Sequence, residues 1–154
     1  MIRRQLINFQ NRSVDVRVGL GAFDELSRMF ASAVGKPKRA MVVWNSASSE
    51  RFDEVVEHAL VDAGFAVSQF SLEVSPAGAT LADADAIFGA LSANGITCDD
   101  LVVAVGDAAT CSVVSWCANQ WCGRTECALL PTTFDAMLTV ATTMKPLVAS
   151  SANA

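Results

Sequence analysis

Three short segments that follow apolar runs carry the residues of this chain that could do chemistry. They are residues 44–46, 106–110 and 131–133, and each contains amide, carboxylate or hydroxyl side chains. Ligands of a parallel sheet bind beyond the carboxyl ends of its strands. If the apolar runs are strands of one such sheet, the three segments share an edge and form the candidate site.

The second segment, Gly106 followed by Asp107 and Ala108, predicts a turn from a strand into a helix. Free backbone N–H groups and the helix dipole at such a turn attract a phosphate. A phosphate cradle usually has several glycines, because the backbone must approach the ligand without a Cβ in the way. Here Gly106 stands alone and an acidic residue follows it. An ordinary turn and a phosphate or dinucleotide site both stay open.

The other two segments offer uncharged polar groups. Asn45 ends one apolar run, and Pro131 is followed by the hydroxyl groups of Thr132 and Thr133. A threonine in this place either caps a helix or contacts a ligand, and the sequence does not choose between the two roles.

Metal binding has little support in the sequence. The one histidine, His58, lies at helical spacing between Glu54 and Asp62, which predicts a position on the polar face of a helix. The five cysteines form no C-x-x-C pair, so no zinc site is predicted. We expect free thiols in a reducing compartment and, because the first residues lack a signal-peptide apolar core, a cytoplasmic protein.

Strands and helices alternate along the chain. Strands are predicted at 2–9, 13–18, 40–44, 65–72, 101–105 and 127–130, the first two as a hairpin, with helical spacing between the later ones. This order predicts a parallel sheet with right-handed crossovers, an α/β Rossmann-like domain with an N-terminal β-hairpin. We expect one domain over 1–148 and a disordered tail over 149–154.

The helical spacing also predicts which side chains point inward. Val55 and Leu81 are assigned to the core faces of their helices, and Thr80 with Asp83 predicts a capping arrangement. Trp116 and Trp121 are expected on different faces of a later helix, with at least one packing outside the core of the domain.

Composition limits the classes of partner. The formal net charge is −5 and the isoelectric point is near 4.7, which argues against nucleic-acid binding. No stretch is apolar enough to predict a membrane span. Hydrophobic residues make up 52% and mean hydropathy is +0.37. Either the apolar residues lie on strands buried on both faces, or a further face is buried against a homo-oligomer partner or a second domain, and both can hold together.

The order of these pieces resembles 3-dehydroquinate synthase, the metal- and NAD-dependent lyase of the shikimate pathway. The resemblance covers nearly the whole chain and rests on residues 16–19, 23–26, 63–67 and 101–106, and most on 129–133, Leu-Leu-Pro-Thr-Thr. The family has a glycine-glycine-lysine after its two threonines, and Lys145 stands twelve residues after Thr133. The resemblance implies the N-terminal, Rossmann-like domain of that family.

This sequence departs from the family where the family binds its ligands. The family's GGGVVGD run, which cradles the NAD pyrophosphate and supplies a substrate-binding aspartate, here begins Gly106-Asp107-Ala108, with Ser112 in place of the aspartate. Three further sets of family residues are replaced. The pair that holds the ribose side of the cofactor corresponds to Asn45 and Ala47. The glutamate–lysine pair corresponds to Pro76 and Ala79, and the remaining aspartate corresponds to Thr139. The resemblance therefore retains only Gly106, Thr132, Thr133 and Lys145 by position.

Two functions stay in competition. The first is a degenerate dehydroquinate synthase-like domain without catalytic residues, acting in protein association or regulation. The second is the NAD- or nucleotide-binding domain of a divergent 3-dehydroquinate synthase whose metal-binding C-terminal domain lies outside this chain. In the second case the resemblance assigns Lys145 to the substrate, and the cofactor-binding residues would be Asn45, Gly106, Asp107, Ala108, Thr132 and Thr133.

Overall fold

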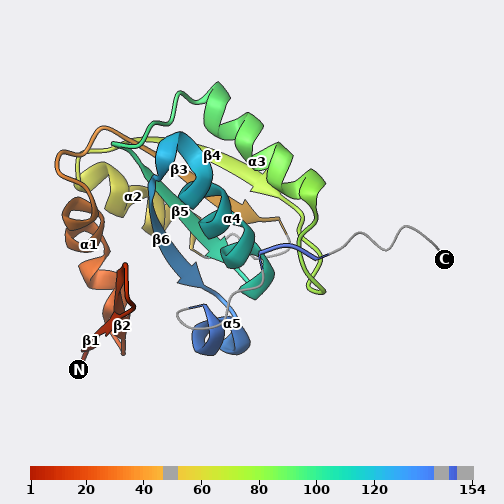
Figure 1. Ribbon diagram of the computed structural model, residues 1–154. Helices are drawn as coiled ribbons and strands as arrows, with labels where there is room; N and C mark the ends of the chain where they lie inside the picture. The colour runs from red at the N-terminus through yellow and green to blue at the C-terminus, as the bar shows by residue number, and fades with distance from the viewer. Residues whose placement is uncertain (47–51, 141–145, 149–154) are drawn as a thin grey trace.

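A four-stranded parallel sheet forms the centre of the computed structural model, which describes residues 1–46, 52–140 and 146–148. Its strand order is β4-β3-β5-β6 (Figure 1). The bounds are β3 Arg39–Asn45, β4 Ala66–Leu72, β5 Leu101–Gly106 and β6 Glu126–Pro131. The two central strands are apolar because both of their faces are covered, and every residue of β5 is buried.

Helices cover both faces of this sheet. They are α1 Leu26–Ala33, α2 Asp53–Asp62, α3 Leu81–Ala93, α4 Ala108–Gln120 and α5 Phe134–Thr139, with short 3₁₀ turns at Ala22–Glu25 and Trp121–Gly123. Helices α1 and α2 pack on one face, and α3 and α4 pack on the other. Helix α5 follows the carboxyl end of β6 (Figure 1).

Alternation along the strands divides the core into two layers. On β3, Ala40, Val42 and Trp44 pack toward α1 and α2, whereas Met41 and Val43 pack toward α3 and α4. All five side chains are buried. Asn45, the next residue, therefore points to the α4 side of the sheet at its carboxyl edge.

The N-terminal hairpin is a separate two-stranded sheet. Its strands, β1 Arg3–Asn8 and β2 Ser13–Val18, pair antiparallel and contain no buried residue. An ion pair of 2.9 Å joins Arg17 of β2 to Glu25, just before α1. Figure 1 shows the hairpin at the N-terminal end of the molecule, away from the main sheet.

Most of the predicted elements are confirmed. The observed strands lie within about two residues of the predicted ones, a margin normal for element boundaries. The capping box of Thr80 and Asp83 at the start of α3 is present, with Thr80 N donating to the Asp83 carboxylate at 2.7 Å. His58 is exposed, as expected, and the cysteines are free thiols.

Two side chains predicted to lie in the core are exposed. Val55 is 45% exposed and Leu81 is 70% exposed. The buried stripe of α2 is narrow and follows Val56, Ala59 and Leu60, so Val55 falls one position outside it. Leu81 is the first residue of α3 and lies outside its buried stripe, which begins at Ala84.

The prediction that Trp116 and Trp121 lie on different faces is also wrong. Both rings pack against Phe88 of α3, with centroid separations of 6.1 Å and 5.9 Å. Trp121 follows the last residue of α4, where the backbone becomes extended, and this turns its ring back toward α3. Its Nε1 donates a hydrogen bond of 2.7 Å to the carbonyl of Ile96.

Within the described ranges, no helix has the length and apolar character needed to cross a lipid bilayer. The tail over 149–154 lies outside the described residues, and so do Ala47 and Lys145.

Candidate functional site

The structure brings most of the predicted site residues together at the carboxyl edge of the sheet. Strand β5 lies between β3 and β6, so the ends of these strands are neighbours. Gly106 pairs with Pro131 in register, and Thr132 N donates a hydrogen bond of 2.8 Å to the carbonyl of Gly106. Asn45 approaches Gly106 from the other side.

Asp107 is the N-cap of α4. Its Oδ1 accepts a hydrogen bond of 2.9 Å from Thr110 N and another of 2.7 Å from Thr110 Oγ1. A side-chain oxygen that binds an amide in the first turn is the usual way to satisfy a helix N-terminus. The carboxylate also places its negative charge at the positive end of the helix dipole.

A buried polar chain extends from this cap to β3. Asn45 Nδ2 donates a hydrogen bond of 3.0 Å to Thr110 Oγ1, whose own proton goes to Asp107. Asn45 is 3% exposed and Thr110 is fully buried. The chain Asn45–Thr110–Asp107 therefore links β3 to the start of α4, through a buried hydrogen bond from Asn45 and partly buried ones to Asp107.

The space above Gly106 is filled by the same side chains. A Cβ at this position would lie 3.0 Å from Thr110 Cβ and 3.1 Å from Asn45 Cβ, closer than side-chain carbons normally approach. Glycine is needed here because α4 and β3 pack directly against the turn. The missing Cβ serves internal packing and leaves no room for a ligand at this point.

The two threonines have different roles. Thr133 caps α5, since its Oγ1 accepts a hydrogen bond of 3.2 Å from Ala136 N. This is the helix-cap alternative that the sequence left open. Thr132 is partly buried, and its backbone joins β6 to the end of β5.

Positions that are charged in dehydroquinate synthase hold neutral residues here, and some of these residues are buried or hydrogen-bonded within a helix. Ala79 is fully buried and belongs to the core on the α3 and α4 side. Ser112 is 5% exposed on α4, whereas Pro76 is exposed in the loop before α3. Thr139 donates a hydrogen bond of 2.8 Å to the carbonyl of Asp135, within α5. None of these four side chains can carry a charge.

Burial also suppresses the reactivity of the thiol nearest the turn. Cys111 lies one residue after Thr110 and is fully buried, with its Sγ 3.7 Å from the carbonyl of Gly106. Desolvation, reinforced by the negative charge of Asp107, raises the pKa of the Cys111 thiol to about 12. This thiol is protonated at neutral pH and is not a nucleophile.

Thr110 lies in the predicted segment 106–110, but its role in the site was not predicted. The available signal was its spacing, since an acidic residue followed three positions later by a hydroxyl residue is a pattern of helix N-termini. Its contact with Asn45 joins residues 65 positions apart, which no local pattern contains.

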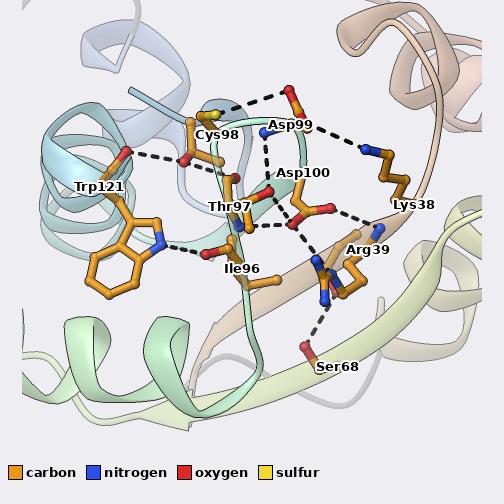
Figure 2. A network of polar contacts seen from close by, with 11 residues as sticks. Lys38, Arg39, Ser68, Ile96, Thr97, Cys98, Asp99, Asp100 and Trp121 are labelled. Carbon is orange, nitrogen blue, oxygen red and sulfur yellow. Dashed lines mark hydrogen bonds and ion pairs between the residues drawn. The ribbon is translucent and has the colours of Figure 1, made fainter. Parts of the chain in front are cut away.

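The opposite edge of the sheet holds a second polar network, around Asp100 (Figure 2). The Asp100 carboxylate is fully buried and accepts hydrogen bonds from Thr97 N at 2.8 Å, Thr97 Oγ1 at 2.9 Å and Arg39 N at 3.1 Å. Arg39 Nε completes the set at 3.4 Å. The network fixes the loop before β5 onto the start of β3.

An open depression of about 430 Å³ lies beside this network. Its charged lining consists of Lys36, Lys38, Asp99 and Glu126. Lys38 pairs with Asp99 at 3.5 Å, and both side chains are more than half exposed. Charges of both signs that are this well solvated form an ordinary surface rather than a selective site.

Comparisons with known proteins give a fold and no sequence relative. No protein-family model and no curated protein matches the chain in sequence. Among solved structures, a 2-deoxy-scyllo-inosose synthase in complex with carbaglucose-6-phosphate, NAD⁺ and Co²⁺ matches with a TM-score of 0.74 and 16% identity. Another structure of a 2-deoxy-scyllo-inosose synthase matches with a TM-score of 0.75, also at 16% identity.

The fold is dehydroquinate synthase-like. Each match covers 86% of this chain and 36% of the solved chain, so the domain spans about a third of the length of the enzymes it resembles. The expected Rossmann-like sheet and N-terminal hairpin are confirmed. At this identity the likeness carries the fold alone.

The residues at the turn do not fit the pyrophosphate of NAD, the cofactor that the resemblance implies. The first-turn amide of Thr110 is taken by Asp107, and the space above Gly106 is filled by Thr110 and Asn45. A carboxylate 4 Å from a phosphate charge would repel it by about 4 kcal/mol at an effective dielectric constant near 20.

Proposed function

We propose that this chain is a dehydroquinate synthase-like domain without lyase activity of its own, which acts through protein association. The proposal rests on two features. At the turn between β5 and α4, a carboxylate of the chain itself caps the helix where a phosphate would bind, and on α5 large apolar side chains point to solvent. The first feature weighs against catalysis, and the second supplies a surface for a partner.

The observation that carries the association is the outward face of α5. Phe134, Met137 and Leu138 are 76%, 58% and 61% exposed, while Ala136 between them is fully buried. The smallest apolar side chain of the helix is therefore buried in the domain core, and the three large ones are exposed to water. Contiguous exposed apolar side chains of this size usually mark an interaction site.

Sedimentation velocity at micromolar to tens of micromolar concentration tests the association. We expect a reversible dimer or higher species, because burying each large side chain contributes about 1.5–3 kcal/mol. Phe134→Ser is expected to weaken the association at least about tenfold. Leu81→Ser, which removes an equally exposed apolar side chain from α3, is the matched control and should leave it unchanged. A strict monomer over the whole range contradicts the proposal.

The loss of lyase activity has its own assay. Purified chain supplied with NAD⁺, a divalent metal and the substrate of 3-dehydroquinate synthase should form no dehydroquinate. Formation of product above the level of a buffer control would refute the non-catalytic assignment, whatever the oligomeric state.

The second candidate is a nucleotide-binding domain of a divergent synthase that works with a metal-binding domain. Its support is the fold likeness to an enzyme whose solved structure contains NAD⁺ and Co²⁺. On this hypothesis, thermal stability should rise on titration with NAD⁺, by about 2.7 kcal/mol at a ligand concentration 100 times the dissociation constant. No shift with NAD⁺, NADH, ADP or ATP at millimolar concentration removes this candidate.

A further inference from the structure

The turn between β5 and α4 is where a dinucleotide would have to meet this fold. The first four amides of a helix have no partner within the helix, and an anion or a capping side chain must satisfy them. In this chain one of these amides, that of Thr110, is bound internally, since Asp107 Oδ1 accepts a hydrogen bond from it and another from the Thr110 hydroxyl. The carboxylate of Asp107 therefore takes the place of an external anion at this amide.

A side chain of β3 also supports the Asp107–Thr110 cap. Thr110 Oγ1 accepts a hydrogen bond from the side-chain amide of Asn45 while it donates to Asp107, so the rotamer of each side chain is fixed by the next. Asn45 and Thr110 are nine-tenths buried or more, and their carbon atoms close over Gly106. Opening the turn would break buried hydrogen bonds and separate β3 from α4.

We infer that Asp107, with Thr110 and Asn45 behind it, excludes the diphosphate group of dinucleotides from the carboxyl edge of this sheet. The exclusion has two parts, which are occupation of the capping position and repulsion by a charge. It concerns what the edge rejects, and it goes beyond the association proposed above because it holds for a monomer and for an oligomer alike.

Amide-resolved NMR titration with NAD⁺ measures the exclusion directly. In the wild-type chain, the amide signals of residues 106–110 should show no saturable shift up to millimolar NAD⁺. In Asp107→Gly, which removes the internal anion, NAD⁺ should bind at least about tenfold more tightly and shift the amide of Thr110. A wild-type chain that binds NAD⁺ with saturable shifts over 106–110 overturns the inference.

Two further variants keep the test decisive. Asp107→Ser retains a capping oxygen but no charge, so it replaces Asp107→Gly if that variant fails to fold, and a gain in NAD⁺ affinity is expected from the lost repulsion alone. Asp83→Ser is the matched control, because Asp83 accepts a hydrogen bond from the amide of Thr80 at the start of α3, a different helix from the one that Asp107 caps. If neither Asp107 variant gains affinity over the wild type, or if Asp83→Ser gains as much, Asp107 is not the excluding group.

The titration separates this inference from the proposed function. A wild-type chain that rejects NAD⁺ and stays monomeric supports the exclusion and refutes the association. A wild-type chain that dimerises through α5 and also binds NAD⁺ at 106–110 does the reverse.

Discussion

Asp100→Asn removes one charge from the fully buried carboxylate that ties the loop before β5 to the start of β3. The change keeps the size and shape of the side chain, so it reports the hydrogen bonds and the charge rather than a cavity. All the groups around Asp100 are donors, namely the amide and hydroxyl of Thr97 and the amide and guanidinium of Arg39. An asparagine has one oxygen to offer them.

The magnitude follows from that mismatch. Whichever way the new side-chain amide turns, its NH₂ group faces a backbone N–H, either that of Thr97 or that of Arg39. Leaving one buried donor unsatisfied costs about 1–3 kcal/mol, and weakening a hydrogen bond to a charged group adds about 1 kcal/mol. Arg39 is 47% exposed, so water compensates its lost ion pair. We expect a total near 3 kcal/mol, a fall in Tm of roughly 6–12 °C for a chain of this length.

Urea unfolding followed by tryptophan fluorescence measures this difference, with Asp99→Asn as the matched control. Asp99 is the preceding residue, is 68% exposed and pairs with Lys38 at 3.5 Å, so its replacement should cost less than about 0.5 kcal/mol. The reasoning is refuted if Asp100→Asn lies within the same 0.5 kcal/mol of the wild type, or if the two variants are equally stable.

The same comparison has a defined pH dependence. Burial acts to raise the pKa of Asp100, but the hydrogen bonds from Thr97 and Arg39 and the charge of Arg39 outweigh it and hold the pKa below the ordinary 3.8. A lowered pKa gives stability that is present above pH 3.8 and is lost as the pH falls through the value in the folded state. The difference between wild type and Asp100→Asn should therefore be full at neutral pH and shrink below about pH 4.

Three other outcomes are expected. A thiol reagent at mildly alkaline pH should modify the exposed thiols of Cys98 and Cys122 at once. It should modify Cys111, Cys117 and Cys127 only on unfolding, because burial shields these thiols and raises their pKa values. Trp121→Phe keeps the ring against α3 but loses the bond from Nε1 to a carbonyl, so it should cost about 1 kcal/mol in denaturant unfolding, more than Trp116→Phe. Gly106→Ala should destabilise the fold by about 1–3 kcal/mol through overpacking. Gly89→Ala, inside α3 with open space around it, should stabilise the fold by about 0.5–1 kcal/mol. Equal effects of the two substitutions would contradict the packing described at the turn.

The elements were predictable because their signals are local. The strands β3 and β5 are short apolar runs, and the helices between them show regular spacing with a capping box at Thr80 and a left-handed glycine at Gly64, whose φ is +97°. Each of these features is decided by residues within a few positions of one another, so a single sequence contains them.

The direction of individual side chains was less predictable. Val55 and Leu81 are apolar and near the right spacing, yet whether they reach the core depends on how each helix is placed over the sheet. Trp121 was assigned from helical spacing, but its backbone has already left the helix. These errors arise from tertiary placement, which local periodicity does not contain.

The predicted site residues do meet at the carboxyl edge of the sheet, but the hydrogen bonds between them were not foreseen. Asp107 was recognised as the acidic residue that follows the lone glycine of the turn, whereas its bond to Thr110 and the contact of Thr110 with Asn45 depend on two strands and a helix meeting. Lys145, the residue that the resemblance assigns to substrate, lies outside the described residues, and its role stays a prediction.

The hairpin of β1 and β2 has a consequence for how the chain loses its structure. Because none of its strand residues is buried, it shares no apolar layer with the sheet, and an isolated two-stranded ribbon is at best marginally stable. The hairpin should therefore open on its own, far more often than the whole molecule does. Its amide protons should exchange with deuterated solvent long before those of β5, so the chain contains two regions with separate opening free energies.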